Sequence, residues 1–298
     1  MRTAVITLCG GRLPHLRNQL RGIAAGSRRP DTHIVVALGD PALAAAVTAD
    51  RTRVVEFDCA APLPLAAARN LGARAALAEG AEVLIFLDVD CVPGPTLLAR
   101  YHDLAATGEP ALWCGPVTYL PPPPPAGYDL TRLGDRRAPH PARPDPGVDG
   151  VVRDGDHDLF WSLSFALTAE TWRTLGGFHP GYRGYGGEDT DFGAKAAAAG
   201  IPLHWAGGAD AYHQYHPVSD PPVEHRTDIL ANAAVFHRRW GRWPMTGWLR
   251  AFADAGLADY DPARDLWTLR SRRSVPSASA TGGPPPGIPA APGSRYTP

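Results

Sequence analysis

The sequence predicts an α/β protein built on a mostly parallel, twisted sheet flanked by helices. Over residues 1–118, short apolar runs rich in β-branched residues alternate with helical patterns, and this alternation is typical of βαβ units with right-handed crossovers. The chain has 298 residues, of which 44% are hydrophobic and 20% charged. Such a length and composition are typical of a soluble globular protein with a substantial core.

The expected elements follow one another along the chain. In the first half, strands are expected over 4–8, 33–38, 53–57, 83–87 and 113–120. Helices are expected between them, over 13–25, 41–48 and 65–78. In the second half, the pattern predicts strands over 160–167 and 202–205 and helices over 169–175, 191–199 and 226–240. The run 83–87 is apolar at every position, which indicates a strand covered on both faces.

Changes in composition divide the chain into five segments. Residues 1–120 carry the alternation of strands and helices. Residues 121–158 are rich in proline, arginine and aspartate without apolar periodicity, so we expect either a functional lid or a disordered loop. Ordered patterns return over 159–220 and continue in a helical segment over 221–269. The Ser, Pro, Gly and Ala content of 270–298 predicts a disordered tail.

Composition excludes several classes of function. The net charge is −1 and the pI is near 6.8, which argues against nucleic-acid partners and a polybasic membrane surface. Lys195 is the only lysine, so a P-loop is excluded. Cys9, Cys59, Cys91 and Cys114 show no C-x-x-C pairing, which argues against a zinc site and a disulfide scaffold. Without a membrane-spanning run or signal peptide, we expect a cytoplasmic protein, with peripheral membrane association left open.

Two acidic residues follow the strand predicted over 83–87. Asp88 and Asp90 stand where the chain leaves the sheet, at the edge where open α/β sheets bind ligands. Carboxylates in that position can hold a divalent metal. The alternative is a surface turn with two solvated acids, because a D-x-D sequence is short and common.

A second acidic group follows a glycine-rich loop. Glu188, Asp189 and Asp191 stand at the start of a predicted helix, where the helix dipole favours negative charge. They are either simple first-turn acids or part of a site. The preceding pair Gly186-Gly187 favours a crowded site, because glycine lets a substrate approach the backbone.

Two histidines, His213 and His216, follow the last strand expected in the core. One could ligate a metal while the other contacts a phosphate or a neighbouring ligand. A lone histidine is more often structural, so the metal hypothesis depends on the presence of Asp88 and Asp90.

In this order, the motifs resemble those of GT-A glycosyltransferases of family 2 type, with a segment similar to the galactosyltransferase C-terminal domain. The series consists of Asp88-Val89-Asp90, then Phe160-Trp161 followed by Phe165-Ala166-Leu167, then Gly176-Gly177-Phe178, then Gly186-Gly187-Glu188-Asp189, and a histidine after the next strand. The resemblance covers about residues 3–240. It implies the GT-A (nucleotide-diphospho-sugar transferase) fold, with nucleotide binding over 1–120 and an acceptor side over 159–220.

The resemblance also implies roles for individual residues. Asp88 and Asp90 would hold Mn²⁺ or Mg²⁺ against the donor diphosphate, with Asp90 as the direct ligand. His213 would be a third ligand, with His216 as its alternative. Asp189 would be the catalytic base, and Glu188 would bind the acceptor. The residues implied to contact the donor nucleotide are Thr7, Arg12, Asp40, Arg69, Asn70 and Asp88, and those implied to contact the acceptor are Phe160, Trp161, Tyr185 and Gly187.

The implied activity is metal-dependent transfer of a sugar from a nucleotide-diphospho-sugar to the hydroxyl of a glycan or small molecule. A single displacement would invert the anomeric configuration. Asp40 is displaced in register from the family's usual acid, and the turn at 8–12 departs from the usual sequence, so a UDP-sugar is only the default donor. Two alternatives remain: a sugar-nucleotidyltransferase, and a catalytically silent GT-A-like domain that binds a glycan or partner.

Overall fold

The computed structural model of the chain describes residues 1–270, so nearly all of the predicted tail lies outside the described residues. Its main sheet has the strand order β3-β2-β1-β4-β9-β6-β10-β8. The strands are β1 (Thr3–Cys9), β2 (Thr32–Leu38), β3 (Thr52–Phe57), β4 (Val83–Leu87), β6 (Leu112–Cys114), β8 (Val151–Val152), β9 (Ser164–Thr168) and β10 (Leu203–Ala206). Only β8 and β9 run antiparallel to their neighbours in this sheet. The mostly parallel sheet is therefore confirmed.

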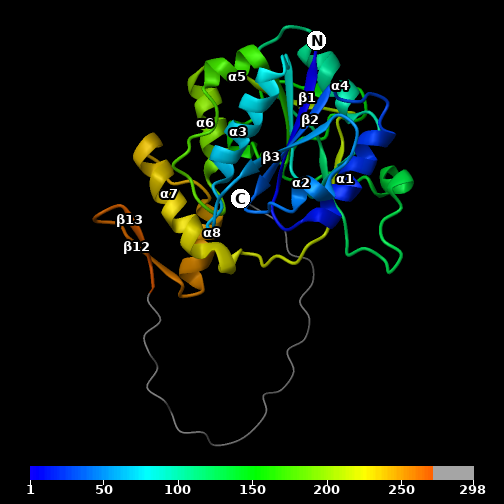
Figure 1. Cartoon of the computed structure of the whole chain (residues 1–298). Coiled ribbons are helices and arrows are strands. Elements are labelled where there is room, and N and C mark those ends of the chain that lie inside the picture. The colour runs from blue at the N-terminus through cyan, green and yellow to red at the C-terminus, as the bar shows by residue number, and fades with distance from the viewer. Residues whose placement is uncertain (271–298) are drawn as a thin grey trace, which may run out of the picture.

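Helices cover both faces of the main sheet (Figure 1). They are α1 (Leu13–Ala25), α2 (Leu43–Ala46), α3 (Leu65–Ala78), α4 (Leu97–Ala105), α5 (Ala169–Leu175), α6 (Glu188–Ala198), α7 (Arg226–Trp240) and α8 (Thr246–Asp254). Side chains of β1 alternate between the faces, as strand geometry requires. Ile6 joins the core shared with α3, α5 and α6, whereas Val5 joins the core shared with α1 and α4.

A second, smaller sheet brings together three segments that are distant in sequence. It consists of β5 (Cys91–Pro93), β11 (Ala211–His213) and β7 (Val117–Tyr119), with β11 in the centre. The single strand expected over 113–120 is wrong, because it divides into β6 of the main sheet and β7 of the small sheet. Gly115 lies at the break, where a Cβ atom would come within 1.9 Å of the carbonyl oxygen of Ala209. The backbone of Ala209 can approach this closely only because Gly115 has no side chain.

Residues 121–158 have defined structure, which contradicts the interpretation of this segment as a disordered loop. The segment contains the 3-10 helix η1 (Leu130–Arg136), strand β8, and the start of the 3-10 helix η2 (His157–Leu159). Arg137 forms ion pairs with Asp145 (2.6 Å) and Asp210 (2.7 Å), which tie the segment to the chain before β11. Whether it acts as a lid remains a prediction.

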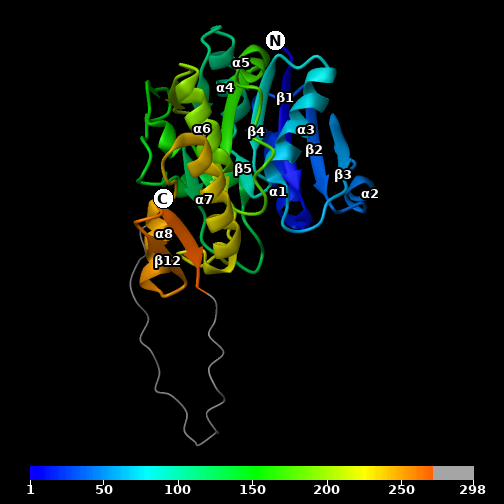
Figure 2. The same cartoon turned by 90° about the vertical axis from the view of Figure 1, so that its left-hand side faces the viewer.

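The C-terminal part of the described chain lies toward the end of the molecule where β1 and β2 finish (Figure 2). It contains the 3-10 helix η3 (Val223–His225), α7, α8 and a hairpin of β12 (Ala258–Asp261) and β13 (Leu266–Leu269). None of the helices within residues 1–270 combines the length and apolar character needed to cross a membrane.

Candidate active site

A cavity of about 1100 Å³ opens where the parallel strands end. Leu8 and Leu38, at the carboxyl ends of β1 and β2, line it together with Asp88, which follows β4. Trp161 lines another wall of the same cavity, and so does Trp248 of α8. The cavity therefore lies at the sheet edge where open α/β sheets bind ligands, and the C-terminal segment closes one side of it.

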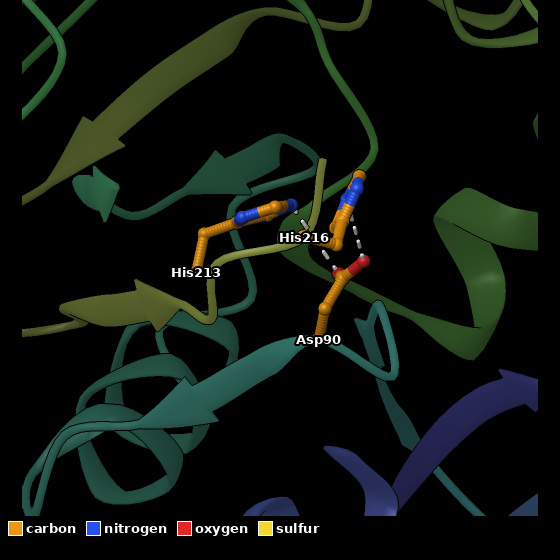
Figure 3. Close-up of side chains that lie close together, drawn as sticks. All are labelled: Asp90, His213 and His216. Atoms are coloured by element: carbon orange, nitrogen blue, oxygen red, sulfur yellow. Dashed lines mark ion pairs between the residues drawn. The ribbon is translucent and has the colours of Figure 1, made fainter. Parts of the chain in front are cut away.

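Asp90, His213 and His216 form a cluster of potential metal ligands in this cavity. Their ligand atoms all lie within 4.8 Å of one another. Nε2 of His213 lies 3.5 Å from Oδ1 of Asp90, and Nε2 of His216 lies 3.5 Å from Oδ2. Figure 3 shows both imidazole rings directed toward the same carboxylate. The small sheet creates this arrangement, because antiparallel pairing of β5 with β11 places His213 opposite Cys91.

The protonation preferences of these groups suit metal binding. Burial lowers the pKa of His213, although the charge of Asp90 opposes the shift, and a neutral imidazole is the form that binds metal. Burial alone would raise the pKa of Asp90, but His216, His213 and Arg12 more than offset it and lower that pKa to about 2. One carboxylate and two imidazoles favour Mn²⁺ over Mg²⁺, since Mg²⁺ prefers oxygen ligands.

Asp88 does not belong to this cluster. Its Oδ1 accepts a hydrogen bond from Nη2 of Arg69 at 3.2 Å. Burial raises the pKa of Asp88 to about 6, an effect that Arg69 opposes and Asp90 reinforces. The expected part of Asp88 in holding the metal, beside Asp90 as the direct ligand, stays a prediction. In this structure it pairs with an arginine beside the metal-ligand cluster.

Arg69 links the two acidic groups of the site. It is 4% exposed, and its Nη1 donates to Oε1 of Glu188 at 2.9 Å. Burial opposes its positive charge, but Asp88 and Glu188 prevail and raise the pKa of Arg69. A buried cation shared by two carboxylates holds the chain after β4 and the start of α6 in a fixed relation.

Glu188 and Asp189 begin α6 and line the cavity. Burial raises the pKa of Asp189 to about 7, and the neighbouring charge of Glu188 adds to the shift. Within the described residues, Oε2 of Glu188 is buried without a hydrogen-bond partner. The helix start thus offers one carboxylate that can exchange a proton near neutral pH and one free acceptor oxygen.

The loop before α6 depends on glycine. Gly184, Gly186 and Gly187 all have positive φ, the last at 91°. On α7, Nδ2 of Asn232 donates to the carbonyl oxygens of Tyr185 (3.2 Å) and Gly186 (2.7 Å). Gly186 lines the cavity, whereas Gly187 caps the helix and does not. Gly187 therefore shapes the loop, and the expectation that it contacts the acceptor is not supported.

The aromatic residues expected at the acceptor have different positions. Trp161 and Tyr185 line the cavity, but Phe160 is fully buried and packs against Phe165 with a centroid separation of 4.9 Å. The expectation that Phe160 contacts the acceptor is therefore wrong. Trp161 is stacked on the guanidinium of Arg143, whose Cζ lies 3.8 Å from the ring centroid.

Of the residues expected at the donor nucleotide, Arg12, Arg69 and Asp88 line the cavity. Thr7 is 1% exposed and donates its hydroxyl proton to Gln19, so its expected nucleotide contact is wrong. Asn70 and Asp40 also lie outside the cavity lining. The Asn70 amide exchanges two hydrogen bonds of 2.8 Å with the backbone of Phe178. Asp40 follows β2 without reaching the lining.

Sequence reasoning missed the wall contributed by the C-terminal segment. Trp243, Met245 and Trp248 line the cavity, and Trp248 lies 5.9 Å from Tyr185 between ring centroids. No motif marks these residues. Two tryptophans in a short segment after a predicted helix were the only available signal.

The fold is similar to that of solved GT-A glycosyltransferases. One is GalNAc-T7 with UDP, GalNAc and Mn²⁺, at a TM-score of 0.50 and 15% identity over 72% of this chain and 43% of that chain. Another is S. aureus TarS 1-349, at a TM-score of 0.54 and 12% identity over 78% of this chain and 65% of that chain. The expected GT-A fold is confirmed.

The sequence comparisons add a family match within that fold. The model of the N-terminal domain of galactosyltransferase matches residues 154–217, which confirms the galactosyltransferase-like segment. Validoxylamine A glucosyltransferase of Streptomyces hygroscopicus subsp. jinggangensis (strain 5008) is 30% identical over 169 residues, covering 47% of this chain and 36% of that protein. The counterpart from S. hygroscopicus subsp. limoneus is also 30% identical over 169 residues, covering 47% of this chain and 34% of that protein. The chain therefore spans about a third of the length of these curated relatives.

Proposed function

We propose that the protein is a metal-dependent, inverting glycosyltransferase that moves a sugar from a nucleotide-diphospho-sugar to an acceptor hydroxyl. The observation that carries this proposal is the placement of two chemically different groups in one cavity of a GT-A fold. The cluster of Asp90, His213 and His216 supplies ligands for a divalent cation, and Asp189 supplies a base.

The donor side is suited to a diphosphate leaving group. A divalent cation bound there acts as a Lewis acid that stabilises the negative charge developing on the diphosphate. Arg12 lines the cavity, and its Nη1 lies 2.6 Å from Oδ2 of Asp90, so its guanidinium stands where phosphate oxygens would approach the cluster. Beside the metal-ligand cluster, Arg69 forms an ion pair with Asp88.

On the acceptor side, Asp189 takes the proton of the attacking hydroxyl. A base works best when its pKa is close to the working pH, and burial places the pKa of Asp189 at about 7. Glu188 lines the cavity next to Asp189, which supports it as the neighbouring acid that binds the acceptor. Trp161 and Tyr185 offer aromatic faces against which a sugar ring can pack. Attack from this side in a single step inverts the anomeric carbon.

The named relatives guide the choice of substrates to test. The GalNAc-T7 structure contains UDP, GalNAc and Mn²⁺, and the curated relatives are validoxylamine A glucosyltransferases. We therefore take UDP with Mn²⁺ as the first donor system, with glucose and GalNAc as the first sugars.

Cys9, Cys59, Cys91 and Cys114 are unpaired, which supports a reducing compartment such as the cytoplasm.

A thermal-shift panel of UDP-, GDP- and dTDP-sugars, each with Mn²⁺, Mg²⁺ or chelator, tests the donor side without a known acceptor. We expect a UDP-sugar with Mn²⁺ to raise the Tm of the parent protein but not that of Asp90→Ala. Slow metal-dependent hydrolysis of the same donor would support transfer. If no nucleotide-sugar binds with any metal, the proposal fails, and pyrophosphate release from a nucleoside triphosphate and sugar phosphate would favour a nucleotidyltransferase instead.

A further inference from the structure

The chain contains few carboxamide side chains, and each of them connects separate segments around the candidate active site. The complete set is Asn18, Gln19, Asn70, Gln214 and Asn232. A carboxamide can donate and accept hydrogen bonds without adding a charge. It can therefore fix the backbone beside a cation site without altering the charge of that site.

Gln19 on α1 holds both ends of the turn that presents Asp90. It is 0% exposed, and its Nε2 donates to the carbonyl oxygens of Asp88 (2.7 Å) and Cys91 (3.0 Å). The N–H of Cys91 also donates to the Asp88 carbonyl oxygen at 2.8 Å, which closes the turn. A single buried amide group thus satisfies two carbonyl groups on either side of Asp90.

A buried chain of hydrogen bonds fixes the orientation of Gln19. Its Oε1 accepts from the Thr7 hydroxyl at 2.9 Å, and that hydroxyl lies 3.0 Å from Nε2 of His33. Burial lowers the pKa of His33 to about 3, so the ring is neutral. Because Thr7 gives its only proton to Gln19, Nε2 of His33 must carry the proton donated to Thr7. The network therefore has one hydrogen-bonding arrangement and favours one orientation of the Gln19 amide.

Asn18, the preceding residue on α1, reaches the segment that carries the two histidines. Its Nδ2 donates to Oε1 of Gln214 at 2.7 Å, and Nε2 of Gln214 donates to the carbonyl oxygen of His15 at 3.1 Å. The backbone N–H of Gln214 donates to the carbonyl oxygen of Asp90 at 2.7 Å. Since Gln214 directly follows His213, α1 contacts both chain segments of the ligand cluster.

We infer that Asn18, Gln19 and Gln214 are positioning residues that hold Asp90, His213 and His216 at ligand spacing before a metal binds. The inference rests on the proposed metal site and adds the residues that give the site its shape. Two adjacent amides of one helix fix the two segments relative to each other. Residues that orient metal ligands in this way typically contribute about 10- to 100-fold to metal affinity.

Manganese binding to the full chain without nucleotide provides the main test. Gln19→Leu removes the buried amide while approximately keeping its volume, and Asn18→Ala removes the partly exposed one. We expect calorimetry to show Mn²⁺ affinity about 10- to 100-fold weaker for Gln19→Leu, and a smaller loss for Asn18→Ala. Asn70→Ala is the matched control, because it loses two hydrogen bonds to Phe178 that do not touch the cluster. It should lower Tm yet keep Mn²⁺ affinity within about twofold of the parent.

A double-mutant cycle separates positioning from general destabilisation. If Asn18 acts through Gln214, the combined Asn18→Ala and Gln214→Ala variant should weaken Mn²⁺ binding by less than the product of the two single effects. Independent, multiplying effects would contradict a shared function. If Gln19→Leu does not fold, the double-mutant cycle still tests whether Asn18 and Gln214 act as positioning residues.

Hydrogen exchange of the metal-free protein distinguishes failure of this inference from failure of the metal site. In Gln19→Leu, we expect faster exchange in peptides covering 88–92 and 211–216, and no change there in Asn70→Ala. If the parent binds no Mn²⁺ but these peptides still respond, the proposed metal site fails and the positioning contacts stand. Unchanged exchange together with parental Mn²⁺ affinity in both Gln19→Leu and Asn18→Ala would overturn the inference.

Discussion

The two sides of the candidate active site are held in place by different means. On the metal side, the pairing of β5 with β11 joins distant parts of the chain, and amides of α1 hold them. On the base side, Glu188 and Asp189 begin a helix after a glycine loop that Asn232 supports. The metal side depends on long-range pairing, and the base side depends on a local helix start. Substitutions should therefore separate donor binding from turnover.

The largest expected effect is on turnover, from the base side. Asp189→Asn keeps the shape of the residue but cannot accept the acceptor's proton, so kcat should fall by about 10²- to 10⁴-fold. Donor and Mn²⁺ affinity should stay within about twofold, because Asp189 lies outside the ligand cluster. Steady-state kinetics and calorimetry on the same preparation measure both. Turnover equal to that of the parent would remove Asp189 from the mechanism.

The corresponding substitution on the metal side should act on binding. Asp90→Ala removes the carboxylate that both histidines face, so Mn²⁺ affinity should fall by at least about 100-fold. Donor affinity should then no longer depend on Mn²⁺. Calorimetry with and without Mn²⁺ measures this loss, and Asp189→Asn serves as the control. Mn²⁺-dependent donor binding that survives in Asp90→Ala would contradict the assigned site.

The pH dependence of turnover sharpens the same comparison. Burial, reinforced by Glu188, raises the pKa of Asp189 to about 7, and only the deprotonated carboxylate can act as a base. At saturating Mn²⁺ and donor, the rate should rise about tenfold per pH unit below that value and level off above it. The rate at each pH is corrected for the metal occupancy measured at that pH. A flat rate between about pH 5.5 and 7 would argue against Asp189 as the base.

A smaller effect, on acceptor binding, is expected from Trp161, which lines the cavity. Trp161→Ala removes an aromatic face that Arg143 supports by stacking, and aromatic contacts of this kind contribute about 1 kcal/mol. The acceptor KM should rise by roughly fivefold at constant Mn²⁺ affinity. Trp161→Phe, which keeps an aromatic ring, should recover part of the loss. If donor KM changes instead, Trp161 belongs to the other side of the site.

Much of the fold could be predicted where the sequence pattern is long and periodic. Helices α1, α3, α5 and α7 begin and end at the expected residues, and so does β4. The small sheet could not be predicted, because β5, β7 and β11 have three residues each, too few to show a period. Their pairing partners are set by the tertiary fold. Helices α4 and α8 were also missed.

The chemistry of the site was easier to predict than the direction of its side chains. Asp90, His213 and His216 lie close together, and which of the histidines ligates a metal stays a prediction. Thr7, by contrast, stands at the expected strand but faces α1, because side chains alternate along β1 and its neighbours Ile6 and Leu8 take the other face. Phe160 likewise precedes a cavity residue while pointing into the core. A motif identifies a position, and the strand face or turn decides what that position contacts.

The register between β5 and β11 also has a consequence for the order of folding. It pairs Cys91 with His213, so the metal-ligand cluster takes shape only after most of the chain has been made and has folded back on itself. A ribosome-bound or truncated chain that ends before β11 carries the D-x-D sequence but lacks both histidines. The Mn²⁺ binding proposed for this cluster would therefore report the completion of folding in vitro, independently of any substrate.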